Sequence, residues 1–260
     1  MPIITLTTDY GLRDPYAGQL KGALLSACPT ATLVDITHEI GAYDLVEAAY
    51  FLQHIHDHYP EGTIHLCTVD NTYEQEPSYL CFGFDGQVYI LPDNGLAFLL
   101  SSRNDFHFVR LPAAEHGNST KATIGAAVRQ LALGYAPERL GPRAEDVVRS
   151  LRPVPVTNPM YIRGSIIHID RYDNAVLNVH RSLVERMAKG RRIHTRFSSS
   201  DPIVDIVDHY HEAPEGELLA RYNSRGYVEL AINKGRAAQL FGLQRDQLVQ
   251  LEFQGEAVAV

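Results

Sequence analysis

The chain opens on the stretch that decides its fold, Pro2-Ile3-Ile4-Thr5-Leu6-Thr7-Thr8-Asp9-Tyr10-Gly11. Residues 2–8 are apolar or β-branched and carry no charge, which is typical of a buried strand. A polar turn follows at residues 9–11, and residues 15–27 have helical spacing. A strand that ends in a polar turn and leads into a helix is the opening unit expected of an α/β protein.

The same alternation continues through the first half of the chain. Further strands are predicted at residues 31–36, 63–69, 79–84 and 87–91, and further helices at residues 43–58 and 122–134. The last two strands flank Asp85-Gly86, a dipeptide that favours a hairpin turn. We therefore predict an N-terminal α/β sandwich-like domain over residues 1–150, with a parallel or mixed sheet and helices on its faces.

The pattern changes after a proline-rich stretch, residues 151–159, which contains Pro153, Pro155 and Pro159. Such a stretch is typical of an extended linker. Beyond it, short strand candidates occur at residues 164–170, 175–179, 192–197, 203–207, 226–232 and 247–253. We predict a smaller C-terminal β-barrel domain over residues 160–260.

Composition narrows the class of partner. The net charge of -8 and the scattered basic residues argue against a nucleic-acid partner. No apolar run reaches the length of about 18 residues that a membrane span needs. The three cysteines, Cys28, Cys67 and Cys81, form no C-x-x-C motif and favour a reducing compartment. We expect a cytoplasmic protein that acts on a small molecule.

Familiar catalytic and metal motifs are absent from the sequence. The first strand is not followed by G-x-G-x-x-G, and there is no Walker loop and no G-x-S-x-G elbow. His54 and His58 lie one helical turn apart, as zinc ligands can, but the same spacing fits a polar helix end. We predict no bound metal and no cofactor.

Polar residues at strand ends are the first candidates for a site. Asp9 and Asp14 bracket the turn before the first helix, and a carboxylate can accept two hydrogen bonds from a ribose diol. Asp14 equally suits a helix N-cap, because Pro15 follows it. Asp70 ends a second apolar strand, and Asn94 lies in a sharp turn after another. Strand ends are where open α/β sheets place their ligands.

Two predicted turns of the second domain also combine polar and charged side chains that can bind a ligand. The segment Asp170-Arg171-Tyr172-Asp173-Asn174 offers a carboxylate, an aromatic face and an amide that can together hold a purine. The segment Asn223-Ser224-Arg225-Gly226-Tyr227 offers a hydroxyl and a guanidinium that can hold the carboxylate of an amino acid. Both segments are also what a plain β-turn requires, since Asp and Asn are turn residues.

Five motifs, in order along the chain, resemble those of one known family. They are Thr7-Thr8-Asp9-Tyr10-Gly11 with Asp14, Tyr16, Gly18 and Lys21-Gly22; Val34-Asp35-Ile36-Thr37-His38-Glu39-Ile40; Pro92-Asp93-Asn94-Gly95-Leu96; the segment 169–178; and the segment 223–233. The family is the S-adenosylmethionine hydroxide adenosyltransferases, whose halide-using relatives are fluorinase and chlorinase.

The resemblance implies a fold, an assembly and a reaction. The fold is an N-terminal α/β domain followed by a C-terminal β-barrel. The assembly is a homotrimer, with the ligand between the N-terminal domain of one subunit and the C-terminal domain of the next. The reaction is attack by water or hydroxide on C5′ of S-adenosylmethionine, which gives adenosine and L-methionine. No cofactor is implied, because S-adenosylmethionine is the substrate.

The resemblance also implies roles for individual residues. Asp70 is the catalytic residue. The substrate-binding set is Asp9, at the ribose hydroxyls, with Asp14, Asn94, Asp170, Tyr172, Asn174, Ser224, Arg225, Glu229 and Ile232.

Two positions depart from the family pattern, which pairs the catalytic Asp with an Arg and a His. Pro77 stands where the Arg is expected, in a loop that lacks the family's glycines, and Ser119 aligns with the His. His116 or Lys121 is the expected helper for Asp70. Three interpretations stay open: a hydrolase with a remodelled nucleophile site, a non-catalytic adenosyl-ligand binder that has lost the Asp-Arg-His set, and an adenosyl transferase that uses another nucleophile.

Overall fold

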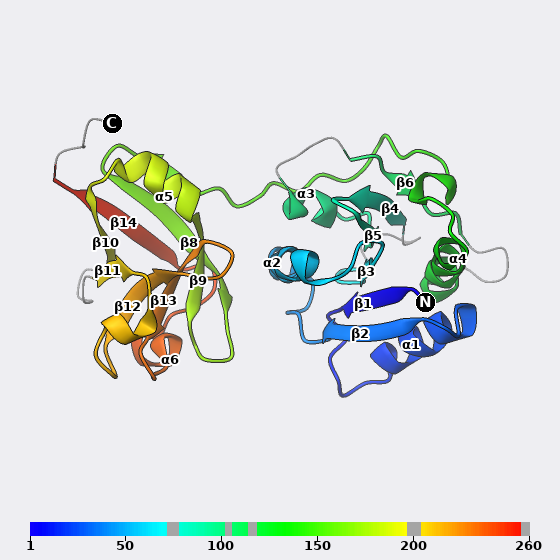
Figure 1. The fold of residues 1–260 in the computed structure, drawn as a ribbon, viewed down its shortest axis with the longest axis horizontal. Coiled ribbons are helices and arrows are strands. Elements are labelled where there is room, and N and C mark those ends of the chain that lie inside the picture. The colour runs from blue at the N-terminus through cyan, green and yellow to red at the C-terminus, as the bar shows by residue number, and fades with distance from the viewer. Residues whose placement is uncertain (72–77, 102–105, 114–118, 197–203, 256–260) are drawn as a thin grey trace. The chain divides into compact units, whose positions relative to one another are not determined.

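A computed structural model describes residues 1–71, 78–101, 106–113, 119–196 and 204–255 (Figure 1). The chain divides into two compact units, Met1–Arg152 and Pro153–Val260.

The first unit is built on a six-stranded sheet with the order β2-β1-β3-β5-β4-β6. Its strands are β1 (Ile3–Thr7), β2 (Thr32–Thr37), β3 (Ile64–Cys67), β4 (Tyr79–Phe84), β5 (Gln87–Pro92) and β6 (Val109–Arg110). Strands β2, β1, β3 and β5 run parallel, whereas β4 is antiparallel to both of its neighbours. The carboxyl ends of the four parallel strands therefore share one edge of the sheet.

Helices cover both faces of this sheet (Figure 1). The helices are α1 (Tyr16–Ala27), α2 (Leu45–Ile55), α3 (Leu96–Leu100) and α4 (Thr120–Ala132), with short 3-10 turns at His56–His58 and Pro137–Arg139. Leu6 and Leu66 pack with α1 and α4 on one face, while Cys67 and Leu91 pack with α2 and α3 on the other. Because both faces are buried, the parallel strands have apolar side chains on both sides.

The second unit is a barrel of seven strands, in which β14 pairs with β8 and closes the circle. The strands described in this unit are β7 (Val156–Asn158), β8 (Tyr161–Ile169), β9 (Ala175–His180), β10 (Arg192–Arg196), β11 (Val204–Val207), β12 (Leu218–Tyr222), β13 (Tyr227–Ile232) and β14 (Leu248–Gln254), of which β8 to β14 form the barrel. Strand β7 is an addition to β8. The remaining elements are α5 (Arg181–Ala188), α6 (Ala237–Phe241) and a 3-10 turn at Tyr210–Glu212.

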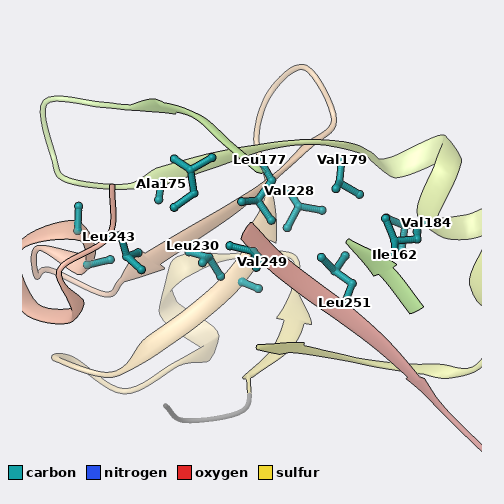
Figure 2. Close-up of a cluster of buried hydrophobic side chains, with 14 of the residues drawn as sticks. Ile162, Ala175, Leu177, Val179, Val184, Val228, Leu230, Leu243, Val249 and Leu251 are labelled. Atoms are coloured by element: carbon teal, nitrogen blue, oxygen red, sulfur yellow. The ribbon is translucent and has the colours of Figure 1, made fainter. Parts of the chain in front are cut away.

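Alternate residues of the barrel strands point into a common core, as Figure 2 shows for Leu177, Val228, Leu230 and Leu251. Because strand side chains alternate between faces, Glu229 lies on the face of β13 opposite to that core. The fold class is thus confirmed as an α/β domain with a C-terminal β-barrel. None of the described helices has the length and apolar character needed to cross a bilayer.

Candidate active site

Asp9 and Asp70 meet at the carboxyl edge of the first sheet. Asp9 follows β1 and Asp70 follows β3, and these strands are parallel neighbours. Asp9 Oδ2 accepts hydrogen bonds from the backbone N–H groups of Asp70 and Tyr43, both at 3.2 Å. Burial, followed by the negative charge of Asp9, raises the pKa of the Asp70 carboxyl. A carboxylate with a raised pKa is a better proton acceptor than an ordinary aspartate.

Asn94 fixes the backbone on which Asp70 stands. Its Nδ2 donates to the carbonyl oxygens of Val69 and Asp70, both at 3.0 Å, and its Oδ1 accepts from Leu96 N–H at 3.1 Å. Asp70 has a φ of 51°, which is in the left-handed region that aspartate adopts more easily than most residues. Asn94 is buried, so its amide supports this turn from within the protein.

A chain of polar contacts holds the loop that carries Asp9. The Thr8 hydroxyl lies 2.9 Å from Nδ1 of the buried His38 and accepts a bond from Tyr10 N–H at 3.3 Å. His38 Nε2 lies 3.1 Å from Asp35 Oδ1, and Lys21 Nζ donates to Asp35 Oδ2 at 2.6 Å. The first two motifs quoted from the sequence thus meet in one network.

The residues that follow the two aspartates also pair. Asn71 Nδ2 donates to the Tyr10 hydroxyl at 2.8 Å. Burial is the largest cause that raises the pKa of Tyr10; hydrogen bonding with Thr68 and Asn71 opposes it, and the charge of Asp9 adds to it. Tyr10 is therefore a neutral phenol at physiological pH.

A cleft of about 640 Å³ opens beside these residues. Its lining joins the two strand ends to α1 and α4 and consists of Asp9, Tyr10, Tyr16, Leu20, Ala42, Tyr43, Asn71, Ser119, Thr120, Lys121 and Ile124. We call it the N-unit cleft. Asp70 and Asn94 are not part of its lining: Asp70 directly precedes the lining residue Asn71, and Asn94 bonds to the carbonyl oxygen of Asp70.

The remaining N-terminal candidates are placed as follows. Asp14 is exposed and lies outside the lining, and Pro15 rather than Asp14 occupies the N-cap position of α1. Lys121 lines the N-unit cleft, where its Nζ donates to Gln19 Oε1 at 2.5 Å. Pro77 and His116 lie outside the described residues. Of the two expected helpers, Lys121 is the one that the structure describes.

A second cleft of about 620 Å³ lies in the barrel unit. It is lined by Arg171, Tyr172, Asn174, Tyr210, Ile232, Asn233, Lys234, Gly235 and Arg236. Three predicted residues, Tyr172, Asn174 and Ile232, therefore share one site. Asp170 supports it from behind: Asp170 Oδ1 accepts from Asn174 N–H at 2.9 Å, and its Oδ2 accepts from Asn174 Nδ2 at 3.0 Å.

Glu229 stands behind the same cleft. The Tyr210 hydroxyl donates to Glu229 Oε1 at 2.5 Å, and Arg221 lies 4.4 Å above the Tyr210 ring and 3.7 Å from Glu229. Burial is the largest cause that raises the pKa of Glu229. Glu229 thus contacts the aromatic wall of the cleft rather than its opening.

Ser224 and Arg225 are not brought to this cleft. They form the turn between β12 and β13, whereas Ile232 lies at the other end of β13. The Arg225 carbonyl lies 3.0 Å from His180 Nε2, at the far end of β9 from Asn174. Within one barrel unit, the two predicted binding turns therefore lie at opposite ends of their strands.

Sequence reasoning missed several lining residues. Tyr10 belongs to the first motif, but its sequence context indicates no binding role, and none is indicated for Asn71, Tyr43 or Tyr210. The sequence offers one signal for Tyr10 and Asn71, which is that each directly follows a candidate aspartate, Asp9 or Asp70. Tyr210 approaches the cleft from a 3-10 turn far along the chain, for which the sequence carries no signal. Within the described ranges, no group of three or more His, Cys, Asp or Glu side chains is arranged to hold a metal.

Comparisons with known proteins identify the family of this chain. Residues 4–131 match the S-adenosylmethionine hydroxide adenosyltransferase N-terminal domain, and residues 164–250 match the C-terminal domain of the same family. The chain is 31% identical to the (R)-S-adenosyl-L-methionine hydrolase of Thermus thermophilus, over 94% of this chain and 97% of the relative. It is 25% identical to the fluorinase of Nocardia brasiliensis, over 96% of this chain and 97% of the relative.

Two solved structures share the fold. A conserved protein from Thermotoga maritima superposes with a TM-score of 0.82 at 23% identity, covering 96% of this chain and 99% of that one. A conserved protein from Thermus thermophilus superposes with a TM-score of 0.72 at 29% identity, covering 96% of this chain and all of that one. With two domain matches in order and a relative above 30% identity across almost its whole length, the chain belongs to the S-adenosylmethionine hydroxide adenosyltransferase family.

Proposed function

We propose that this protein is an S-adenosylmethionine hydrolase, in which water attacks C5′ of the substrate and releases adenosine and L-methionine. The observation that carries the proposal is the pairing of Asp9 with Asp70 at the edge of the N-unit cleft, in a chain of this family. Asp9 is the acceptor for the ribose diol, and Asp70 is the acceptor for the proton of the attacking water.

The chemistry is a single displacement. The positive sulfur makes C5′ electrophilic, and methionine leaves as a neutral thioether. The protein must orient one water molecule in line with the breaking C–S bond. A carboxylate beside the sulfonium also stabilises its positive charge, and its own charged form is favoured by that neighbour. In this proposal Asp70 both orients the water molecule and stabilises the charge of the sulfonium.

The binding residues of the barrel unit belong to the same proposal. Asn174 and Tyr172 offer amide edges and an aromatic face to a purine, and Ile232 offers an apolar wall. Asp170 and Glu229 orient Asn174 and Tyr210, respectively. We assign Ser224 and Arg225 to the methionine carboxylate, keep Asp14 in the substrate-binding set, and assign Asn94 to the support of the Asp70 backbone. Assembly as a homotrimer and a cytoplasmic location are part of the proposal; the three unpaired cysteines are consistent with a reducing compartment.

The test is a product assay with S-adenosylmethionine of each sulfonium configuration, since the relatives in Thermus and Salinispora are named for the R form. Chromatography should show adenosine and methionine in equal amounts. Release of adenine or methylthioadenosine instead would contradict attack at C5′. Tight binding without product would favour a non-catalytic adenosyl-ligand binder, the alternative suggested by Ser119 at the position of the family His.

A further inference from the structure

The turn that carries Ser224 and Arg225 is shaped by hydrogen bonds of its own. Asn223 Oδ1 accepts from the N–H groups of Arg225 and Tyr227, both at 3.0 Å. The Gly226 N–H donates to the Asn223 carbonyl oxygen at 2.9 Å. These bonds fix the shape of the turn, whereas its place on the barrel depends on groups outside it.

The start of α5 supplies outside support of this kind. His180 is the last residue of β9, and its Nε2 lies 3.0 Å from the Arg225 carbonyl oxygen, across 45 residues of sequence. The Arg181 N–H donates to the Gly226 carbonyl oxygen at 2.7 Å. Gly226 shows how closely the segments meet, because its φ is 81° and an added Cβ would lie 2.7 Å from His180 Nε2. The His180 ring therefore sets where the backbone of Arg225 lies.

The partners of His180 determine which ring nitrogen carries its proton. Nδ1 accepts a hydrogen bond from the Ser182 N–H at 3.2 Å, which makes His180 the N-cap of α5. Because an N–H group faces Nδ1, the ring proton is on Nε2 and is donated to the Arg225 carbonyl oxygen. The cap uses Nδ1 alone. Capping therefore does not account for the bond from Nε2 to the turn.

We propose that His180 is a positioning residue for the amino-acid end of the substrate and acts through the turn that carries Ser224 and Arg225. The inference rests on the proposed function, in which this turn binds the methionine carboxylate. A turn that is already held in its binding position loses less conformational freedom when the ligand arrives, so affinity rises. Asn174 lies at the other end of β9 and belongs to the purine end. His180 should therefore matter for S-adenosylmethionine but not for adenosine.

Two substitutions separate the two roles of the ring. His180→Asn places an acceptor as many bonds from the backbone as Nδ1 and keeps a favoured N-cap residue, but it is too short to reach the Arg225 carbonyl. His180→Gln has its amide nitrogen as many bonds from the backbone as Nε2, so it can reach that carbonyl, but Gln is not among the favoured N-cap residues.

The first measurement is KM for S-adenosylmethionine together with the melting temperature. In His180→Asn, loss of one hydrogen bond should raise KM about 3-fold to 10-fold, with kcat and melting temperature near wild type. In His180→Gln, KM should stay closer to the wild-type value while the melting temperature falls. A residue that served only as a cap would give the reverse ranking of the two variants.

The second measurement is calorimetry, which shows the end of the substrate that is affected. The ligands are adenosine and S-adenosylhomocysteine, a neutral thioether that has both ends of the substrate. In His180→Asn, Kd should rise for S-adenosylhomocysteine and stay unchanged for adenosine. His194→Asn is the matched control, because it makes the same substitution in the barrel unit, on β10 and outside the lining of both clefts. It should change neither Kd.

The outcomes separate the inference from the function on which it rests. A wild-type KM in His180→Asn overturns the inference and leaves the hydrolase standing. Equal weakening of both ligands overturns it too, because His180 then supports the barrel as a whole. So does a KM that rises as much in His180→Gln as in His180→Asn. A wild type that forms no adenosine removes the hydrolase function, but the two Kd values still decide the inference. A wild type that binds neither ligand overturns both.

Discussion

The backbone N–H of Asp70 donates a hydrogen bond to Asp9 Oδ2 at 3.2 Å and ties the end of β3 to the end of β1. The proposed ribose ligand and the proposed catalytic carboxylate are therefore set relative to one another by the backbone. A change at either residue is expected to displace the other.

Replacement of Asp9 should affect binding and stability separately. Asp9→Ala removes the acceptor for two backbone N–H groups and should cost about 1–3 kcal/mol of unfolding free energy as well as adenosine affinity. Asp9→Asn keeps an acceptor oxygen for the backbone and should lose affinity with less loss of stability. Calorimetry and urea unfolding measure the two quantities. Unchanged adenosine affinity in both variants would remove Asp9 from the site.

Replacement of Asn94 by Asp should destabilise the protein more than replacement by Ala. Asn94→Asp replaces an N–H donor with a negative oxygen facing two carbonyl groups, whereas Asn94→Ala only leaves those groups unpaired. Both variants should lower kcat by moving the backbone of Asp70, and Asn94→Asp should also unfold at the lower temperature at neutral pH. Equal or greater stability of Asn94→Asp would contradict the bonding assigned here.

Gly95 should not tolerate a side chain. Its φ is 95°, and an added Cβ would overlap the Ser150 hydroxyl. Gly95→Ala is expected to lose about 1–3 kcal/mol of unfolding free energy. Gly22→Ala is the matched control, because Gly22 lies in α1 with open space at its Cβ, and it should be neutral or stabilising by about 0.5–1 kcal/mol. Thermal unfolding that ranks the two variants in the opposite order would refute this.

His65 should make the first unit sensitive to acid. Burial, followed by the charge of His56, lowers the pKa of His65 from 6.5 to about 4. The unfolded chain then binds the proton first as pH falls, so the stability that is fully present above pH 6.5 is lost as pH falls towards 4. The loss from this group approaches about 3 kcal/mol. His65→Leu should show a shallower slope of unfolding free energy against pH over that window; a slope equal to that of wild type would contradict the assignment.

The sequence predicted the elements that have strong local signals. The hairpin of β4 and β5 was located because Asp85-Gly86 separates two apolar runs, and β4 begins and ends where expected. Helix α3 was missed because Leu96–Leu100 is an apolar run too short to show a period. Strand β7 lies inside the stretch expected to be a linker, where Val156–Asn158 pairs with the edge of β8. A strand as short as β7 forms because a partner strand lies beside it, and the local sequence does not reveal that partner.

The candidate site follows the same rule. Asp9 and Asp70 could be expected together because parallel strands end at one edge of a sheet. The bond between Tyr10 and Asn71 could not, since it depends on the paths of two loops beyond the strand ends. The separation of Ser224 from Asn174 along the barrel strands also depends on register, which only the pairing of β9 with β13 reveals.

The most direct test of the central claim is hydrolysis of S-adenosylmethionine in heavy-oxygen water, with the wild type and Asp70→Asn side by side. Attack at C5′ predicts that the heavy oxygen appears in adenosine and that methionine stays unlabelled. Loss of the proton acceptor should slow Asp70→Asn by about 100-fold or more while adenosine still binds. Unlabelled adenosine, or an Asp70→Asn variant that turns over at the wild-type rate, would contradict the account.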